Sequence, residues 1–166
     1  MNGQNIMTDN SSSRLNLAHD NSRGSSIEFS RGVEHLNEKS IPEAVDRLQQ
    51  AYESVGRSSV YHNKYASYCG LARVLSGDSS GIQLCRDAAK SEINDGDVFL
   101  NLARAELFLK HRKSAVIALK KGLQIEPRHL ELRAMREELG VRRRSPMPFL
   151  PRSHPLNHAV GKLLRK

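Results

Sequence analysis

The sequence predicts an all-α protein built as a short solenoid of antiparallel helix pairs, and three observations support this fold class. Residues 27–140 carry apolar and small residues at helical spacing, without strand-like alternation of useful length. Within this range, three stripes of mostly small residues step by four and then by three positions. The stripes begin at Ala44, Gly81 and Ala115, so successive stripes start 37 and 34 residues apart. A recurrence at about this interval is typical of repeated two-helix units.

The helices follow from these stripes in chain order. The stripes consist of Ala44, Leu48, Ala51 and Val55, of Gly81, Cys85, Ala88 and Ala89, and of Ala115, Leu119, Gly122 and Leu123. Each stripe is the packing face of the second helix of a unit, because small side chains let two helices approach closely. A first helix precedes each stripe, and Gly77 ends the one in the second unit. Residues 128–139 then form a capping helix with one apolar stripe (Leu132, Met135 and Leu139), which Gly140 ends.

The third unit resembles the tetratricopeptide repeat. The residues that carry the resemblance, at the spacing of the family pattern, are Phe99, Leu102, Ala103, Ala115, Leu119 and Pro127. The first unit keeps Gly32 but has Glu28 at the aromatic position, where we expect the neighbouring Phe29 to supply the packing. The second unit has Cys69 and Gly70 in place of a Leu-Gly pair. The resemblance spans about residues 25–128 and implies a right-handed superhelical array of three degenerate repeats.

The chain is accordingly divided into three parts. Residues 1–26 are rich in Ser, Asn and Gly and are expected to be a disordered leader. Residues 27–140 form the helical repeat domain with its cap, and residues 141–166 form a basic tail. The tail prolines, Pro146, Pro148, Pro151 and Pro155, favour an extended chain. Beyond them, Leu156, Val160, Leu163 and Leu164 recur at the spacing of a short amphipathic helix.

Composition and motifs exclude several classes of function. No apolar run approaches the roughly 18 residues of a membrane span, and residues 1–26 lack the pattern of a secretory signal, so a cytoplasmic protein is expected. No phosphate-binding loop, nucleophile elbow or HExxH motif occurs, so we expect no enzyme activity and no cofactor. Cys69 and Cys85 are expected to be small core residues. His154 and His158 are expected to be solvated rather than metal ligands.

Positive charge is concentrated at the C-terminal end. Residues 141–166 contain no Asp or Glu and seven basic residues: Arg142, Arg143, Arg144, Arg152, Lys162, Arg165 and Lys166. Three interpretations of this tail stay open. It is solvated, or it packs Met147, Phe149 and Leu150 on the last helix or in the groove, or it binds an anionic membrane or nucleic acid. The absence of aromatic interleaving argues against sequence-specific nucleic-acid binding.

The resemblance also implies a binding surface, because the first helices of tetratricopeptide arrays line a concave groove that binds peptides. By register, the groove residues are Phe29, Val33, Lys64, Leu71, Val74, Arg104 and Phe108, with Leu36, Leu75 and Leu107 beside them. Several of these apolar residues fit the core between helices equally well. Lys64 and Arg104 are the residues best suited to bind a carboxylate of the partner through charge-assisted hydrogen bonds.

These observations predict a non-enzymatic protein–protein interaction module, a scaffold or adaptor that binds a peptide of an unidentified protein. The alternative is a scaffold tethered to an anionic membrane or to nucleic acid through its basic tail. A lesser alternative is a chaperone of the type III secretion translocator-binding kind. Those chaperones also contain three such repeats but are generally acidic, and the basic tail departs from that pattern.

Overall fold

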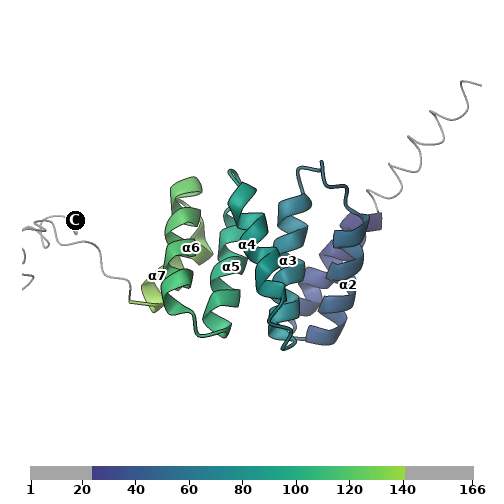
Figure 1. The fold of residues 1–166 in the computed structure, drawn as a ribbon, viewed down its shortest axis with the longest axis horizontal. Helices are drawn as coiled ribbons and strands as arrows, with labels where there is room; N and C mark the ends of the chain where they lie inside the picture. The colour runs from purple at the N-terminus through teal and green to yellow at the C-terminus, as the bar shows by residue number, and fades with distance from the viewer. Residues whose placement is uncertain (1–23, 141–166) are drawn as a thin grey trace, which may run out of the picture.

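The computed structural model describes residues 24–140, and these residues form a row of helices without strands (Figure 1). The first helix covers residues 24–37 of this part of the chain. It is followed by α2 (Ile41–Ser54), α3 (His62–Leu75), α4 (Gly81–Ser91), α5 (Gly96–Phe108), α6 (Arg112–Ile125) and α7 (Leu130–Glu138). Among the helices described, none is long and apolar enough to cross a membrane.

The helices pack as three antiparallel pairs followed by the single helix α7. The first helix pairs with α2, α3 pairs with α4, and α5 pairs with α6. Adjacent pairs contact each other through α2 and α3, through α3 and α5, and through α4 and α5. The turns within the first and third pairs each contain one lysine with positive φ, Lys39 at 64° and Lys110 at 63°. This arrangement matches the two-helix units and the cap that the sequence predicts.

Small residues allow the two helices of a pair to approach closely. On α2, the predicted stripe residues Ala44, Leu48 and Ala51 are fully buried. In the second pair, a Cβ added at Gly70 of α3 would lie 2.7 Å from the carbonyl oxygen of Gly81 on α4. The backbones of α3 and α4 therefore pack against each other at this point, and a side chain has no room there.

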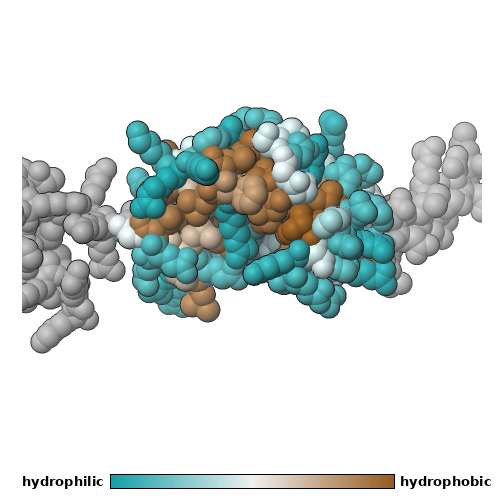
Figure 2. All heavy atoms as spheres, turned by 90° about the horizontal axis from the view of Figure 1, so that it is seen from below, coloured by the Kyte–Doolittle hydropathy of each residue, from teal (hydrophilic) through white to brown (hydrophobic). Residues whose placement is uncertain are grey.

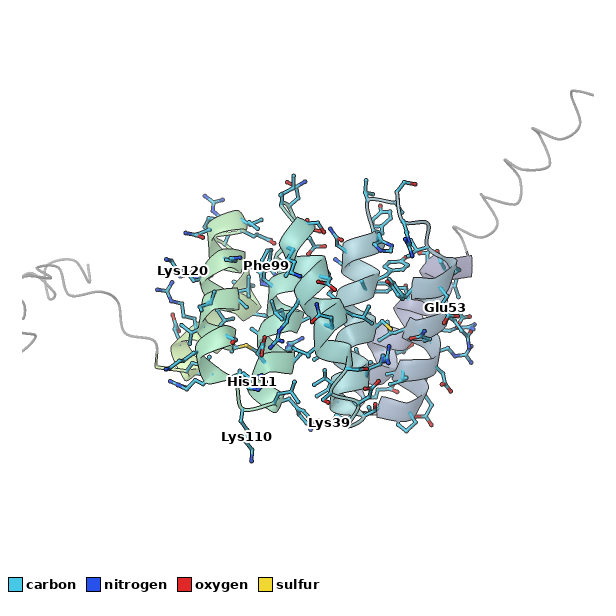
Figure 3. All side chains as sticks on the ribbon, in the orientation of Figure 1. Lys39, Glu53, Phe99, Lys110, His111 and Lys120 are labelled. Atoms are coloured by element: carbon cyan, nitrogen blue, oxygen red, sulfur yellow. The ribbon has the colours of Figure 1, made fainter. Side chains whose placement is uncertain are left out.

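The core continues from one pair to the next. Phe99 of α5 is 2% exposed and packs with Ala66 of α3 and with Ala88 and Ala89 of α4 (Figure 3). A second cluster, between α5 and α6, is covered by Leu132 of α7, whose side chain is fully buried. Since α7 buries one stripe and exposes the rest of its surface, it closes this end of the stack, as a capping helix does.

One carboxylate is buried where the second and third pairs meet. Glu106 of α5 is 3% exposed and accepts hydrogen bonds from the Arg86 guanidinium of α4 at 2.9 and 3.2 Å. His111 Nδ1, in the turn before α6, lies 2.8 Å from the second carboxylate oxygen. A buried carboxylate without partners is costly, so these contacts favour one relative position of the two pairs.

The first helix begins earlier than the sequence predicts. Residues 24–26, which fall within the predicted leader, are helical, and Ser25 is 4% exposed. Gly and Ser are weak helix formers, but packing against the next pair member overrides such propensities. The remainder of the leader (residues 1–23) and the basic tail (residues 141–166) lie outside the described residues, and so do the expectations made for them.

Candidate functional site

The first helices of the three pairs lie side by side and form one face of the molecule. We call the surface formed by the helix of residues 24–37, α3 and α5 the first-helix face; α7 packs beside α5. Side chains three or four residues apart on a helix lie on the same side of it. Lys64 and Tyr68 of α3 therefore share one side, as do Asp97, Asn101 and Arg104 of α5.

An aromatic cluster joins the first helix to α3. The rings of Phe29 and Tyr65 are stacked, with centroids 4.1 Å apart and 3° between their planes, and Tyr68 meets Phe29 edge-on at 5.1 Å. The ring centroids of Tyr61 and Tyr65 lie 6.3 Å apart, and Tyr61 is 58% exposed. Tyr65 is buried, whereas Phe29 and Tyr68 are half-buried. The cluster is thus anchored in the core and also presents ring surface and phenol groups to solvent.

A charge network connects the N-terminal ends of α3, α5 and α7. Lys64 Nζ lies 2.9 Å from Asp97 Oδ2 and 3.2 Å from Asp95 Oδ2. Asp95 also caps α5 by accepting from the Asp97 amide at 2.8 Å. His129 caps α7 through Nδ1, which accepts from the Leu132 amide, and its Nε2 is 3.0 Å from Asp97 Oδ1. Because Nδ1 accepts a hydrogen bond, Nε2 carries the proton and donates a hydrogen bond to Asp97.

The pKa values of this network follow from its geometry. Partial burial acts to lower the pKa of Lys64, but the hydrogen bond and charge of Asp97, together with Asp95, raise it above its usual value. Partial burial acts to raise the pKa of Asp97, but hydrogen bonds from Lys64 and His129 lower it. Burial and the nearby Asp97 charge raise the pKa of Tyr68. At neutral pH the face therefore carries an ammonium and a carboxylate that satisfy each other, and a neutral phenol.

The lower part of the face is also internally paired. Arg104 Nη2 contacts Glu131 Oε2 of α7 at 2.5 Å, and both side chains are substantially exposed. Beneath them, Asn101 is fully buried and donates from Nδ2 to Ser67 Oγ at 3.1 Å. Phe108, at the end of α5, is 52% exposed. The face thus combines aromatic surface with charge pairs whose positive and negative members nearly balance.

The structure corrects part of the predicted groove. Leu71 and Val74 are 3% and 0% exposed, because both pack with Cys85 of α4 and Ala105 of α5 in the core. The prediction that these two residues line a binding surface is therefore wrong. Phe29 and Val33 are half-buried against the core of the first pair, and Phe108 remains accessible.

The two predicted cation anchors have partners within the chain. Lys64 is paired with Asp95 and Asp97, and Arg104 is paired with Glu131. A partner's carboxylate would have to compete with these side chains, which weakens the prediction that Lys64 and Arg104 serve as free carboxylate binders. The seven basic residues assigned to the tail, Arg142 to Lys166, lie outside the described residues.

The cysteines occupy the core, as predicted. Cys69 and Cys85 are both free thiols with fully buried side chains. Burial raises the pKa of Cys69 to about 11 and that of Cys85 to about 12, so both remain protonated and unreactive at neutral pH. Within residues 24–140, no group of three or more His, Cys, Asp or Glu side chains is arranged to hold a metal ion. His154 and His158 lie outside this range.

Comparison with solved structures identifies the architecture. The chain is similar to the TPR domain of Arabidopsis OM64, with a TM-score of 0.55 and 18% sequence identity, over 72% of this chain and 96% of that domain. The fold is a tetratricopeptide-repeat fold. The helix pairs thus form the right-handed superhelical solenoid that the sequence predicts. No family model and no curated protein matches the chain. At this level of identity the similarity establishes the fold alone, so the function must be inferred from the residues of this chain.

Several residues on or beside the first-helix face were not predicted from the sequence. They are Tyr61, Tyr65, Tyr68, Asp95, Asp97, His129 and Glu131. A signal for the first three exists, because three of the four tyrosines recur at helical spacing within eight residues. A signal for Asp95 also exists, because Asp followed by Gly before an apolar run is typical of a helix start. The pairing of Asp97 with Lys64, 33 residues away, has no local signal.

Proposed function

We propose that this chain is a non-enzymatic protein-interaction module that binds a peptide segment of a protein partner along its first-helix face. The supporting observation is the juxtaposition of Phe29 and Tyr68 with the Lys64–Asp97 and Arg104–Glu131 pairs on neighbouring helices. Ring surface supplies apolar contact, and the pairs supply donors and acceptors for a peptide backbone. This combination suits an extended peptide of low net charge.

Balanced charge on the face has a consequence for binding. Because Asp95, Asp97 and Glu131 offset Lys64 and Arg104, a peptide gains little from long-range attraction. Binding then depends on buried ring area and short-range hydrogen bonds, and salt affects it little. The face is short, so we expect a transient complex with a dissociation constant on the order of micromolar.

A double substitution on the face tests this proposal. We expect Tyr68→Ala with Arg104→Ala to weaken binding at least about tenfold, since each loss removes a contact of roughly 1 kcal/mol. The measurement is selection of a random peptide library on the immobilised full chain, followed by titration of the enriched peptides against both proteins. Circular dichroism establishes that the variant keeps its helices.

The second-helix layer provides the matched control. Ile117 and Lys113 lie four residues apart on α6, and both are exposed, Ile117 at 58%. Ile117→Ala with Lys113→Ala removes one apolar and one cationic side chain, as the test variant does, but on the other helix of the pair. Peptides that bind the test variant as tightly as the unchanged chain would contradict the proposal. So would peptides that lose binding only in the control.

A second function, tethering by the tail, is proposed on a different observation. Residues 141–166 carry seven basic side chains and no acidic one, whereas residues 24–140 carry 17 basic and 16 acidic residues. Such a segment attracts anionic membranes and nucleic acids, with about 1 kcal/mol per basic residue near an anionic membrane surface.

Salt dependence and truncation distinguish tethering from peptide binding. We expect retention of the full chain on anionic lipid vesicles to fall steeply when salt rises from about 50 to about 200 mM. A chain that ends at Gly140 should show no retention at either concentration while still binding the selected peptides. Retention that survives the truncation would show that the tail is not the tether.

A further inference from the structure

The end of the molecule that carries the turns within the helix pairs has an apolar surface. Lys39 and Lys110 mark two of these turns at the lower end of the row (Figure 3). Gly77 lies in the third turn, between α3 and α4. Seven large apolar residues lie within two positions of a helix end here: Leu36, Ile41, Leu75, Ile82, Phe108, Leu109 and Leu139. We call them the turn-edge band. Seen from this end, apolar side chains gather in a strip that runs from the α7 end across most of the molecule (Figure 2).

Residues of the band pack on the hydrophobic core. Leu75, Ile82 and Leu109 pack on one core cluster that includes Val74, and Leu139 packs on the cluster covered by α7. Six of the seven side chains are half-buried, and Phe108 is 52% exposed. Apolar strips of this kind on an otherwise polar surface mark contact sites, because leaving them in water is unfavourable.

The chain leaves the described region at one end of this band. Gly140 follows α7 with φ of +59°, a conformation that favours glycine and ends the helix. The Arg112 guanidinium, at the start of α6, donates to the Leu139 carbonyl oxygen. This contact holds the end of α7 against the turn between α5 and α6. The described part of the chain therefore ends close to the start of α6, next to the turn that contains Leu109.

We propose that residues 146–151 of this chain bind along the turn-edge band. This segment, Pro-Met-Pro-Phe-Leu-Pro, contains three large apolar side chains and three prolines within six residues. Prolines hold a chain in an extended conformation, so the segment loses little conformational entropy when it binds. Its apolar residues suit a band that is itself apolar.

The length of the connecting segment fits this placement. Phe149 is the ninth residue after Gly140, and nine residue steps of an extended polyproline-like chain span about 28 Å. Neighbouring helices pack about 8–10 Å apart, so Phe149 reaches from α7 past α5 to the ends of α3 and α4. Attachment through so short a linker gives the segment an effective concentration on the order of millimolar.

Charge does not drive this contact. Lys110, in the turn before α6, and Arg112 and Lys113, at the start of α6, are exposed, and residues 142–144 of the tail are three arginines. Both groups are positive and therefore repel each other, although Glu137 and Glu138 near the end of α7 offset part of this charge. Screening by salt reduces the repulsion. The segment should therefore stay bound at high salt, unlike a tail held by attraction to an anionic partner.

A single tryptophan tests the proposal, because the chain contains none. In the full chain with Phe149→Trp, we expect blue-shifted emission and protection from the neutral quencher acrylamide, at low and at high salt. The reference is a synthetic peptide of residues 141–166 with the same substitution. Adding Leu150→Asp, a change outside the described helices, should return quenching to the level of the peptide. Adding Phe108→Asp should do the same, and Ile117→Asp on α6 should leave the protection unchanged.

Several results would overturn the proposal. Quenching in the full chain equal to that of the peptide would mean that the segment does not bind. Protection that persists in both the Leu150→Asp and Phe108→Asp chains would place the tryptophan elsewhere. Protection that grows with protein concentration, together with dimers in sedimentation, would assign the band to a second copy. Protection that requires anionic vesicles would assign the segment to a lipid surface. Peptide binding to the first-helix face is tested at Tyr68 and Arg104, which do not belong to the band, so the two proposals can fail independently.

Discussion

Phe99→Ala is expected to lower the free energy of unfolding by about 3–5 kcal/mol, the cost typical of removing a fully buried aromatic side chain. Phe99 is 2% exposed and lies where the second and third helix pairs meet. Three of its buried neighbours are Ala66, Ala88 and Ala89, whose short side chains cannot extend to fill the space. The loss is measured by urea unfolding of the full chain, followed by circular dichroism at the helix signal.

A substitution at an exposed phenylalanine provides the comparison. Phe108→Ala removes the same atoms from a side chain that is 52% exposed, so we expect a cost below about 1 kcal/mol. Because Phe99 links two pairs, its loss should also lower the dependence of unfolding on urea, as the pairs begin to unfold separately. A cost for Phe99→Ala as small as that for Phe108→Ala would show that the two pairs are not joined through this ring.

The architecture could be predicted from the sequence because it depends on local patterns that repeat. Ala44, Leu48 and Ala51 step by four and three, and all three are fully buried on α2. The same pattern recurs on α4 and α6, where Cys85 and Leu119 are buried at the equivalent step. Each repeat contacts mainly its neighbours, so a register found in one unit carries over to the next.

The binding surface could be predicted only in part, because it depends on contacts between units. Periodicity assigns Leu71 to one side of α3. In the structure α5 covers part of that side, and Leu71 packs with Ala105 of α5. The sequence gives Lys64 no nearby acidic partner. Only the packing of α3 beside α5 brings Asp97 Oδ2 to 2.9 Å from Lys64 Nζ. Helical spacing sets the direction of a side chain and leaves its neighbour on the next helix undetermined.

The close contact between α3 and α4 leads to the second large effect, that Gly70→Ala destabilises the protein. In an isolated helix this change would stabilise by about 1 kcal/mol, because alanine is the better helix former. Here the new Cβ would lie 2.7 Å from the Gly81 carbonyl oxygen, 2.8 Å from Cys85 Sγ and 3.0 Å from the Cys85 amide nitrogen. Two of these atoms belong to the backbone of α4 and cannot rotate away, so the two helices must separate.

Overpacking of this kind costs about 1–3 kcal/mol or more, which outweighs the gain in helix propensity. We therefore expect urea unfolding of Gly70→Ala at a clearly lower midpoint than that of the unchanged chain. Gly56→Ala is the matched control, because a Cβ at Gly56 meets nothing within 4 Å, and its effect should stay within about 0.5 kcal/mol. If Gly70→Ala instead raised the midpoint, α3 and α4 would have room between them. Small residues on facing helices would then not be required for the two helices of a pair to pack closely.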